Sequence, residues 1–324
     1  MLRALGLGDL LAAVPALVAL QAAFPDHRRV LAAPAGLAPA AAWTGALDEV
    51  VATAPLGALD PALHGAAVAV NLHGRGPQST RSLLDARPRR LLTFAHPDLP
   101  EIRGPAWDEQ EHERDRWCRL LRAHGVPADP AALGITVRGG PVPADPAGAV
   151  LIHPGAARPA VRWPAEHFAA VAGALHREGR RVLVTGGPDE VALAASVGAA
   201  LPGDALLAGR TDLDGLARLV AGAAAVVSSD TGIAHLAFAL AVPSVTVYGP
   251  ISPARWGPPD HPRHRTLWSG QEGDPHATVP FPGLVAVTPA AVLAELTTAL
   301  NHHRPDPPPP DRTAGAGDGL GGRP

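Results

Sequence analysis

The chain has 324 residues, 47% of them hydrophobic, and its net charge of −3 at a sequence pI near 6.6 gives no reason to expect nucleic acid as a partner. All 27 basic residues are arginine, which excludes a Walker A lysine and amine-based Schiff-base or pyridoxal chemistry. The single cysteine, Cys118, can form neither an intrachain disulfide nor a structural zinc site, so we expect a reducing, cytoplasmic location.

The first half of the chain alternates short apolar runs with helical patterns. Strand patterns cover residues 2–7, 29–32, 50–53, 68–71 and 91–94, and helical patterns cover residues 10–24 and 109–124. This alternation predicts a parallel sheet. Asp9 and Pro15 interrupt the first apolar helix, which we therefore interpret as part of a folded domain and not as a secretory signal.

The second half repeats this rhythm after a stretch rich in Gly, Pro and Asp at residues 139–148. Strand patterns cover residues 149–153, 181–185, 225–228 and 244–248, and helical patterns cover residues 166–178, 190–201, 213–223 and 231–240. They predict a second doubly wound parallel sheet. The expected organisation is an N-terminal domain at 1–143, a C-terminal domain at 149–287, a last helix at 288–303 and a disordered tail at 304–324.

Ligands of open parallel sheets bind beyond the carboxyl ends of the strands, where helix N-termini offer free N–H groups to anions. The strongest candidate junction ends a strand pattern at Asp230, Thr231 and Gly232. Gly232 allows a phosphate to approach the backbone, and Thr231 and His235 lie one turn apart on one helical face. The alternative is that Asp230 or Thr231 caps the helix and His235 is an interior histidine.

A second junction follows the strand pattern at 149–153. Gly155 lies in the loop, and the guanidinium groups of Arg158 and Arg162 suit a diphosphate because arginine can bind it in a bidentate way. The alternative is a turn with solvated arginines.

The third junction, at residues 5–11, is a partial dinucleotide fingerprint in which Leu11 replaces the third glycine. Asp9 comes where the first strand turns into a helix. That is a suitable place for a general base facing a cleft, and an N-cap aspartate is the alternative.

Taken together, the three junctions resemble glycosyltransferase family 9, the heptosyltransferase-like enzymes. The resemblance spans about residues 2–300, and the ordered motifs that carry it are Leu7-Gly8-Asp9-Leu10, Pro15-Ala16-Leu17, His153-Pro154-Gly155-Ala156, Arg162-Trp163-Pro164, Gly186-Gly187-Pro188, Asp230-Thr231-Gly232, His235-Leu236-Ala237, Tyr248-Gly249-Pro250 and Arg255-Trp256-Gly257-Pro258. It implies an α/β fold of the GT-B type, in which two Rossmann-like, doubly wound parallel-sheet domains face a cleft.

The resemblance also implies a function in lipopolysaccharide core biosynthesis. The expected reaction is inverting transfer of a heptose-like sugar from a nucleotide diphosphate donor, such as ADP-heptose, to a hydroxyl of a glycan or glycolipid, with Asp9 as general base. The expected donor-binding residues are Gly155, Arg158, Arg162, Glu190 (at the nucleoside ribose), Asp230, Thr231, Gly232 and His235. For the acceptor, we expect contacts from Arg75, Ser79 and Arg81.

One position departs from the family pattern. Val161 stands where family members commonly carry a basic residue, so Arg158 or Arg162 is expected to supply that charge. No cofactor and no metal are expected, because Asp212 and Asp214 suit a helix cap and the histidines at 261–264 and 302–303 lack carboxylate or cysteine partners. We expect a monomer, and peripheral contact with the inner face of the cell membrane stays open.

Other function classes also stay open. An NAD(P)-dependent oxidoreductase would suit two Rossmann-like halves, although the incomplete glycine fingerprint disfavours it. A sugar-nucleotide epimerase shares the GT-B architecture. A binding-only protein could retain the nucleotide-sugar pocket without turnover, and Val161 keeps that alternative open.

Overall fold

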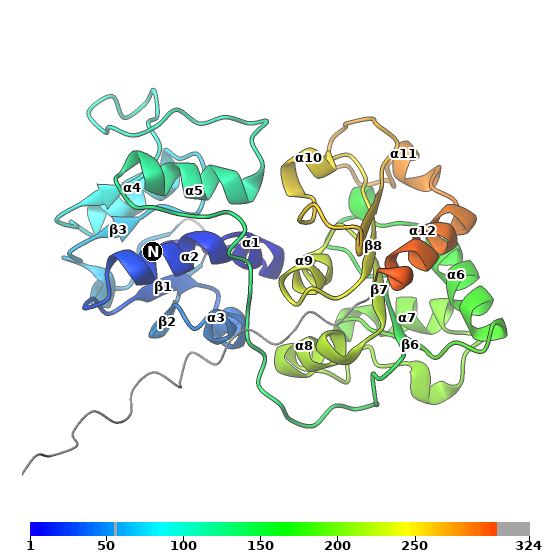
Figure 1. Ribbon diagram of the computed structural model, residues 1–324. Helices are drawn as coiled ribbons and strands as arrows, with labels where there is room; N and C mark the ends of the chain where they lie inside the picture. Colours follow the sequence, from blue (N-terminus) through cyan, green and yellow to red (C-terminus); the bar gives the residue numbers. More distant parts are fainter. Residues whose placement is uncertain (55–56, 303–324) are drawn as a thin grey trace, which may run out of the picture.

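The computed structural model describes residues 1–54 and 57–302, which form two α/β halves joined by an extended connection (Figure 1). The elements of the N-terminal half are α1 (Leu7–Ala12), α2 (Val14–Ala23), β1 (Val30–Ala33), η1 (Ala35–Leu37), α3 (Ala38–Trp43), β2 (Glu49–Ala52), η2 (Pro61–Leu63), β3 (Ala69–Val70), α4 (Gln78–Asp85), β4 (Leu91–Leu92) and α5 (Glu113–Ala123).

The first residues of the chain form the centre of the N-terminal sheet. Leu2 bridges in parallel to Ala32 in β1 and to Asn71 just after β3. Strand β1 pairs with β2 and strand β3 with β4, also in parallel. The spatial order is therefore β2, β1, the segment around Leu2, β3 and β4, and the central segment leads directly into the loop before Asp9.

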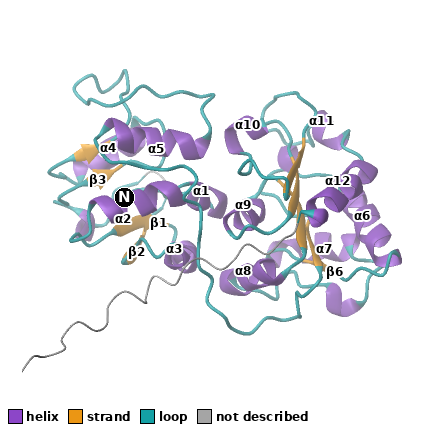
Figure 2. Ribbon diagram, viewed as in Figure 1, coloured by secondary structure: helices purple, strands orange, loops and turns teal. Residues whose placement is uncertain are grey.

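The C-terminal half contains one five-stranded parallel sheet in the order β6-β5-β7-β8-β9, with helices on both faces (Figure 2). Its elements are β5 (Val150–His153), η3 (Pro159–Val161), α6 (Ala165–Arg177), β6 (Val182–Val184), η4 (Pro188–Glu190), α7 (Val191–Val197), η5 (Gly203–Ala205), α8 (Leu213–Gly222), β7 (Ala225–Ser229), α9 (Gly232–Ala239), β8 (Ser244–Val247), α10 (Pro253–Trp256), β9 (His264–Leu267), α11 (Pro282–Val285) and α12 (Pro289–Asn301). Strands β6 and β7 lie on opposite sides of β5, so the winding direction reverses between β5 and β7. A crevice at such a reversal is the expected ligand position in an open α/β sheet.

The N-terminal helices differ from the sequence expectation. The single helix predicted at 10–24 is two helices, and the first begins already at Leu7 because the Gly6 N–H donates to Asp9 Oδ2 at 3.1 Å. Pro15 has no N–H, so the hydrogen-bond ladder of α1 cannot continue through it. The strand predicted at 2–7 is correspondingly reduced to the segment around Leu2.

The other differences have similarly local causes. The helix predicted from 109 begins at Glu113, where His112 Nδ1 accepts the Arg114 N–H at 3.1 Å and caps it. The sequence patterns do not predict α3, α4, α10, α11 or β9: α3 is mostly alanine, α10 and α11 have four residues each, and β9 mixes polar with apolar residues at the sheet edge. The predicted tail at 304–324 and His303 lie outside the described residues. Within the described residues, no helix has the length and apolarity needed to cross a membrane.

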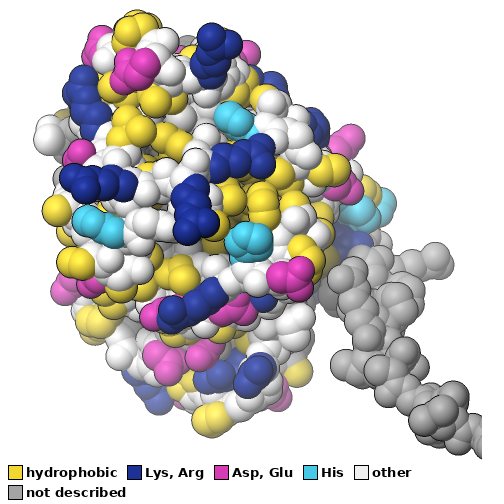
Figure 3. Space-filling model, turned by 90° about the vertical axis from the view of Figure 1, so that its left-hand side faces the viewer, with side chains coloured by type: hydrophobic (Ala, Val, Ile, Leu, Met, Phe, Trp, Pro, Cys, Tyr) yellow, Lys and Arg dark blue, Asp and Glu magenta, His cyan; other side chains and the backbone are white. Residues whose placement is uncertain are grey.

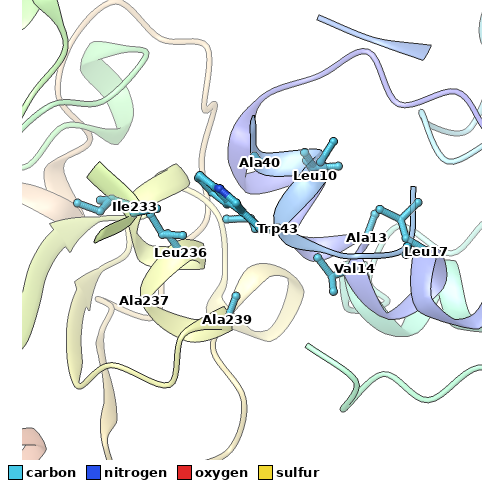
Figure 4. Close-up of a cluster of buried hydrophobic side chains, with 14 of the residues drawn as sticks. Leu10, Ala13, Val14, Leu17, Ala40, Trp43, Ile233, Leu236, Ala237 and Ala239 are labelled. Carbon is cyan, nitrogen blue, oxygen red and sulfur yellow. The ribbon is translucent and has the colours of Figure 1, made fainter. Parts of the chain in front are cut away.

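The two halves pack against each other through α1 and α9 (Figure 1). One hydrophobic cluster contains residues of both halves, with Leu10 and Trp43 from one side and Ile233 and Leu236 from the other (Figure 4). The helices approach so closely that a Cβ on Gly232 would lie 3.0 Å from the Leu7 Cβ. This contact brings the N-termini of α1 and α9 to one place.

Candidate functional site

Both halves line a cavity of about 390 Å³ at the carboxyl ends of their strands. Its lining consists of residues 6–9 from the N-terminal half together with His153, Gly155, Ala156, Ala157, Val161, Glu190, Asp230, Thr231, Gly232, His235 and Trp256 from the C-terminal half. The cavity thus brings together seven of the predicted site residues: Asp9, Gly155, Glu190, Asp230, Thr231, Gly232 and His235. Carboxylates and imidazoles are its charged or titratable side chains, and none of its lining residues is an arginine.

Asp9 presents its carboxylate from the first turn of α1, with 30% of the side chain exposed. Its Oδ2 accepts the Gly6 N–H at 3.1 Å, and its Oδ1 lies 3.6 Å from Arg3 Nη2. The carboxylate is therefore held by a backbone donor and a cation on one side while the other side faces the cavity. The N-cap residue of α1 is Gly6, so the N-cap alternative for Asp9 is wrong; Asp9 is the third residue of the helix and lies in the predicted cleft-facing position.

The loop after β5 lies against Glu190. Gly187 N donates to Glu190 Oε2 at 2.8 Å, and a Cβ on Gly155 would overlap the Glu190 carboxylate, so a side chain at position 155 would have to displace Glu190 from this position. His153 Nδ1 shares a hydrogen bond with Thr185 Oγ1 at 3.0 Å, and its Nε2 lies 3.9 Å from Glu190 Oε2. Burial lowers the pKa of His153 and the negative charge of Glu190 opposes that shift.

The N-terminus of α9 closes the other side of the cavity. Thr231 is the N-cap residue, but its side chain does not cap the helix: its hydroxyl donates to the Ser229 carbonyl at 3.4 Å. His235 Nε2 lies 3.6 Å from Asp230 Oδ1, and its ring meets the Trp256 ring edge-on at 5.8 Å. The first N–H groups of α9 consequently face a cavity in which an anion would find donors without displacing a side-chain cap.

Arg158 and Arg162, both predicted donor-binding residues, are not part of the cavity lining. Arg158 is exposed, while Arg162 Nη2 donates to the Ala156 carbonyl at 2.6 Å and stabilises the loop after β5. The charge expected to compensate for Val161 is therefore absent from the cavity in this conformation.

The predicted acceptor residues also lie outside the cavity. Arg75 is half exposed and lies 3.7 Å from Glu109, and Arg81 is exposed on α4. Ser79 is buried, and its hydroxyl accepts a hydrogen bond from Asn71 Nδ2 at 3.1 Å, so it is not available to a ligand in this conformation.

The sequence reasoning missed several residues close to Asp9. His73 Nδ1 accepts the Ala4 N–H at 3.2 Å, and burial, with a smaller effect of Arg3, lowers its pKa. Arg3 itself is fully buried and pairs with Glu113 at 3.0 Å. His73 could have been noticed because it follows a strand pattern, whereas only the folded chain brings Glu113 next to Arg3.

The structure accounts for the suspected metal residues in other ways. Asp212 Oδ1 caps α8 by accepting the Gly215 N–H at 2.6 Å, and Asp214 accepts the Trp43 indole N–H at 2.7 Å. His264 shares a hydrogen bond with Ser244 at 2.9 Å. Across residues 1–54 and 57–302, no group of three or more His, Cys, Asp or Glu side chains is placed to hold a metal ion.

A second cavity, of about 330 Å³, lies at the amino ends of β1 and β3, at the opposite edge of the N-terminal sheet from Asp9. On the side of the N-terminal half that faces away from the C-terminal half, arginine and histidine side chains lie among hydrophobic ones (Figure 3). Arg29 on the cavity rim is paired with Asp48 at 2.8 Å, and Arg28 with Glu49. The lining of this cavity is mainly aliphatic, with His27 and His64 as its titratable side chains besides the two arginines, and its described lining residues include no carboxylate. The interdomain cavity, which combines carboxylates, histidines and a helix N-terminus, is therefore the candidate active site.

Comparison with known proteins identifies the family of this chain. The family model described as glycosyltransferase family 9 (heptosyltransferase) matches residues 116–278, about half of the chain. The chain belongs to glycosyltransferase family 9. It is 36% identical over 153 residues to lipopolysaccharide heptosyltransferase 2 of Salmonella typhimurium, and this match covers 44% of each protein, so the chain spans less than half the length of the curated relative.

Solved structures show that this family member has the GT-B fold. The glycosyltransferase family 9 protein from Veillonella parvula superposes with a TM-score of 0.77 at 20% identity, covering 93% of this chain and 96% of that one. The ADP-heptose lipopolysaccharide heptosyltransferase II of E. coli superposes with a TM-score of 0.74 at 23% identity, covering 93% and 97%. Two parallel-sheet halves facing a cleft, as the sequence predicted, are thus confirmed.

Proposed function

We propose that this chain is an inverting glycosyltransferase, which moves a heptose-like sugar from a nucleotide diphosphate donor to a hydroxyl of a glycan or glycolipid. The observation that carries the proposal is the single cavity in which Asp9 faces the N-terminus of α9 and the loop after β5. The names of its relatives, lipopolysaccharide heptosyltransferase 2 and ADP-heptose lipopolysaccharide heptosyltransferase II, support ADP-heptose as donor and lipopolysaccharide core as acceptor.

Asp9 is the proposed general base. Its carboxylate takes the proton of the acceptor hydroxyl while the acceptor oxygen attacks the anomeric carbon from the face opposite the leaving group. The bond between that carbon and the phosphate oxygen breaks, and the nucleoside diphosphate leaves with the bonding electrons. Direct displacement inverts the anomeric centre, and general-base assistance of this kind contributes about 10²- to 10⁴-fold in rate.

The leaving diphosphate gains negative charge that has to be stabilised. The N–H groups at the start of α9, around Gly232, and those of the loop at Ala156 and Ala157 are the proposed donors, because they line the cavity and need no reorganisation. Thr231 adds a hydroxyl. Arg158 and Arg162 remain proposed diphosphate ligands, and each would have to leave its present position to reach the cavity.

The remaining donor groups have proposed contacts on either side of the diphosphate. Glu190, fixed by Gly187 N–H beside Gly155, suits the ribose hydroxyls as an acceptor. Asp230 and His235, paired at 3.6 Å, suit the donor sugar. On the N-terminal half, Arg75 and Arg81 are the exposed candidates for an anionic acceptor. We propose a cytoplasmic location at or near the inner face of the membrane, where a glycolipid acceptor would be found.

A transfer assay tests the proposal. The purified protein is incubated with ADP-heptose and lipopolysaccharide from an E. coli strain lacking heptosyltransferase 1 or 2, and the product is analysed by mass spectrometry. We expect addition of one heptose by the wild type and loss of transfer by Asp9→Asn. The matched control is Asp85→Asn, because Asp85 is an exposed carboxylate of α4 away from the cavity. Transfer at wild-type rate by Asp9→Asn would contradict the assignment of the base.

Donor binding is tested separately by thermal shift with ADP, other nucleoside diphosphates and NAD(P), since a ligand specific to the folded state raises the melting temperature. We expect stabilisation by ADP that is weakened in Thr231→Ala and kept in Thr297→Ala, whose hydroxyl is exposed on α12. Stabilisation by NAD(P) alone would overturn the transferase proposal in favour of an oxidoreductase.

A further inference from the structure

Arg3 is the last residue of the central strand segment, and its side chain is completely buried behind Asp9. Its Nη2 donates to Glu113 Oε1 at 3.0 Å, its Nη1 donates to the Leu72 carbonyl, and its Nε donates to the Asp9 carbonyl at 2.5 Å. The guanidinium group also lies 4.9 Å from the centre of the Trp117 ring. A single side chain thus joins three separate parts of the N-terminal half: α1, the loop after β3 and α5.

Arg3 belongs to a network of four charged side chains, of which only one is accessible. Glu113 is buried and binds Arg3 through Oε1 and Arg116 through Oε2, and Trp117 Nε1 donates to Glu113 at 2.9 Å. Asp9 supplies the second negative charge at 3.6 Å from Arg3 Nη2. Of these four charged side chains only Asp9 reaches the cavity, since Arg3, Glu113 and Arg116 are at most 6% exposed.

A buried ion-pair network is not needed to hold helices together, because hydrophobic residues of the same volume often pack as stably as a buried ion pair. Unlike an aliphatic side chain, the guanidinium group can fix the orientation of its neighbours. Its planar donors bind the Asp9 backbone carbonyl and lie beside one oxygen of the Asp9 carboxylate. Oδ2 is already engaged by Gly6 N–H, so rotation of the carboxylate is restrained from two sides.

We propose that Arg3, held in place by Glu113, is a positioning residue that fixes the Asp9 carboxylate toward the acceptor hydroxyl. The inference rests on the proposed function of Asp9 as the base. Arg3 touches neither substrate; it acts by keeping Asp9 in the attacking geometry, where a displacement of about 1 Å can cost on the order of 10²-fold in rate.

The test compares Arg3→Lys with Arg116→Lys. Arg116 is the matched control because it is equally buried and pairs with the same Glu113, yet makes no contact with Asp9. Lysine keeps the charge in both variants but loses the planar set of donors. We expect Arg3→Lys to lower kcat about 10- to 100-fold with an unchanged KM for ADP-heptose, and Arg116→Lys to keep kcat within about threefold. ADP-induced thermal stabilisation confirms that each variant is folded.

Equal losses of kcat in the two variants, or a wild-type kcat in Arg3→Lys, would overturn the proposal. If Arg3→Lys does not fold, Glu113→Gln replaces it, because the amide keeps an acceptor for Trp117 while removing the charge that holds Arg3. We then expect kcat to fall about 3- to 10-fold at constant donor KM, and an unchanged kcat would refute the positioning role. Asp9→Asn distinguishes failure of the proposed function from failure of the positioning role. If Asp9→Asn is fully active, the proposed base is wrong. If Asp9→Asn is inactive and Arg3→Lys is active, only the role of Arg3 is refuted.

Discussion

Gly8 lies where α1 crosses α9, and Gly8→Ala measures how closely the two halves meet. A Cβ at this position would lie 2.8 Å from His235 Cδ2 and 3.6 Å from Gly232 Cα. The His235 side chain is 11% exposed and is held between Asp230 and Trp256, so it has little room to move away. The added methyl group therefore has to displace the ring or separate the helices.

The size of the effect follows from two opposing terms. Overpacking of a close contact costs about 1–3 kcal/mol, while alanine in place of glycine in a helix gains up to about 1 kcal/mol. For Gly173→Ala in α6 only the gain in helix propensity applies, because a Cβ at Gly173 would meet no described residue outside its own helical turn within 4 Å. We expect Gly173→Ala to stabilise the protein and Gly8→Ala to be less stable than Gly173→Ala by about 1–3 kcal/mol.

Urea unfolding of both variants, followed by ADP titration, checks this expectation. Because the strain falls on His235 and Gly232, Gly8→Ala should also bind ADP more weakly, whereas Gly173→Ala should bind it as the wild type does. Equal unfolding free energies for the two variants would refute the reasoning, since they would mean that α1 and α9 are not in close contact in solution.

Three further predictions concern the base, a buried histidine and metal dependence. Asp9→Asn should lower kcat by about 10²- to 10⁴-fold without changing the KM for ADP-heptose, and initial rates at saturating acceptor measure both constants. Burial, with the nearby charges of Arg263 and His261, lowers the pKa of His264 from 6.5 to about 3. As the pH falls, the unfolded chain therefore binds this proton at a higher pH than the folded chain does. The part of the unfolding free energy that depends on neutral His264 is fully present above pH 6.5 and is lost toward pH 3, at up to about 1.4 kcal/mol per pH unit. The slope of unfolding free energy against pH should be shallower in His264→Gln, and an identical slope would contradict the assignment. Transfer activity should survive EDTA, and a loss of activity that Mg²⁺ or Mn²⁺ restores would show that the reaction needs a metal ion.

The amino-acid sequence by itself determined the fold class and predicted several of the residues that line the candidate site. Alternation of apolar strand patterns with helical patterns predicts two parallel sheets, and Gly155, Asp230, Thr231 and Gly232 follow strands β5 and β7, where the winding reverses. In a parallel sheet all carboxyl ends lie at one edge, so residues after strands converge whatever their separation in the chain. Local order alone thus predicted that these residues share a cavity.

Only the tertiary structure decided where long side chains and packing partners lie. Arg158 and Arg162 follow the same strand as Gly155, yet one is exposed and the other turns to the Ala156 carbonyl, because a flexible side chain takes its direction from its nearest neighbours. Ser79 is buried, and its hydroxyl accepts a hydrogen bond from Asn71, a contact that its place in the sequence did not reveal. The pairing of Arg3 with Glu113 joins residues 110 positions apart, and no periodicity in the sequence carries that information, since the contact exists only once α5 has packed against the central strand.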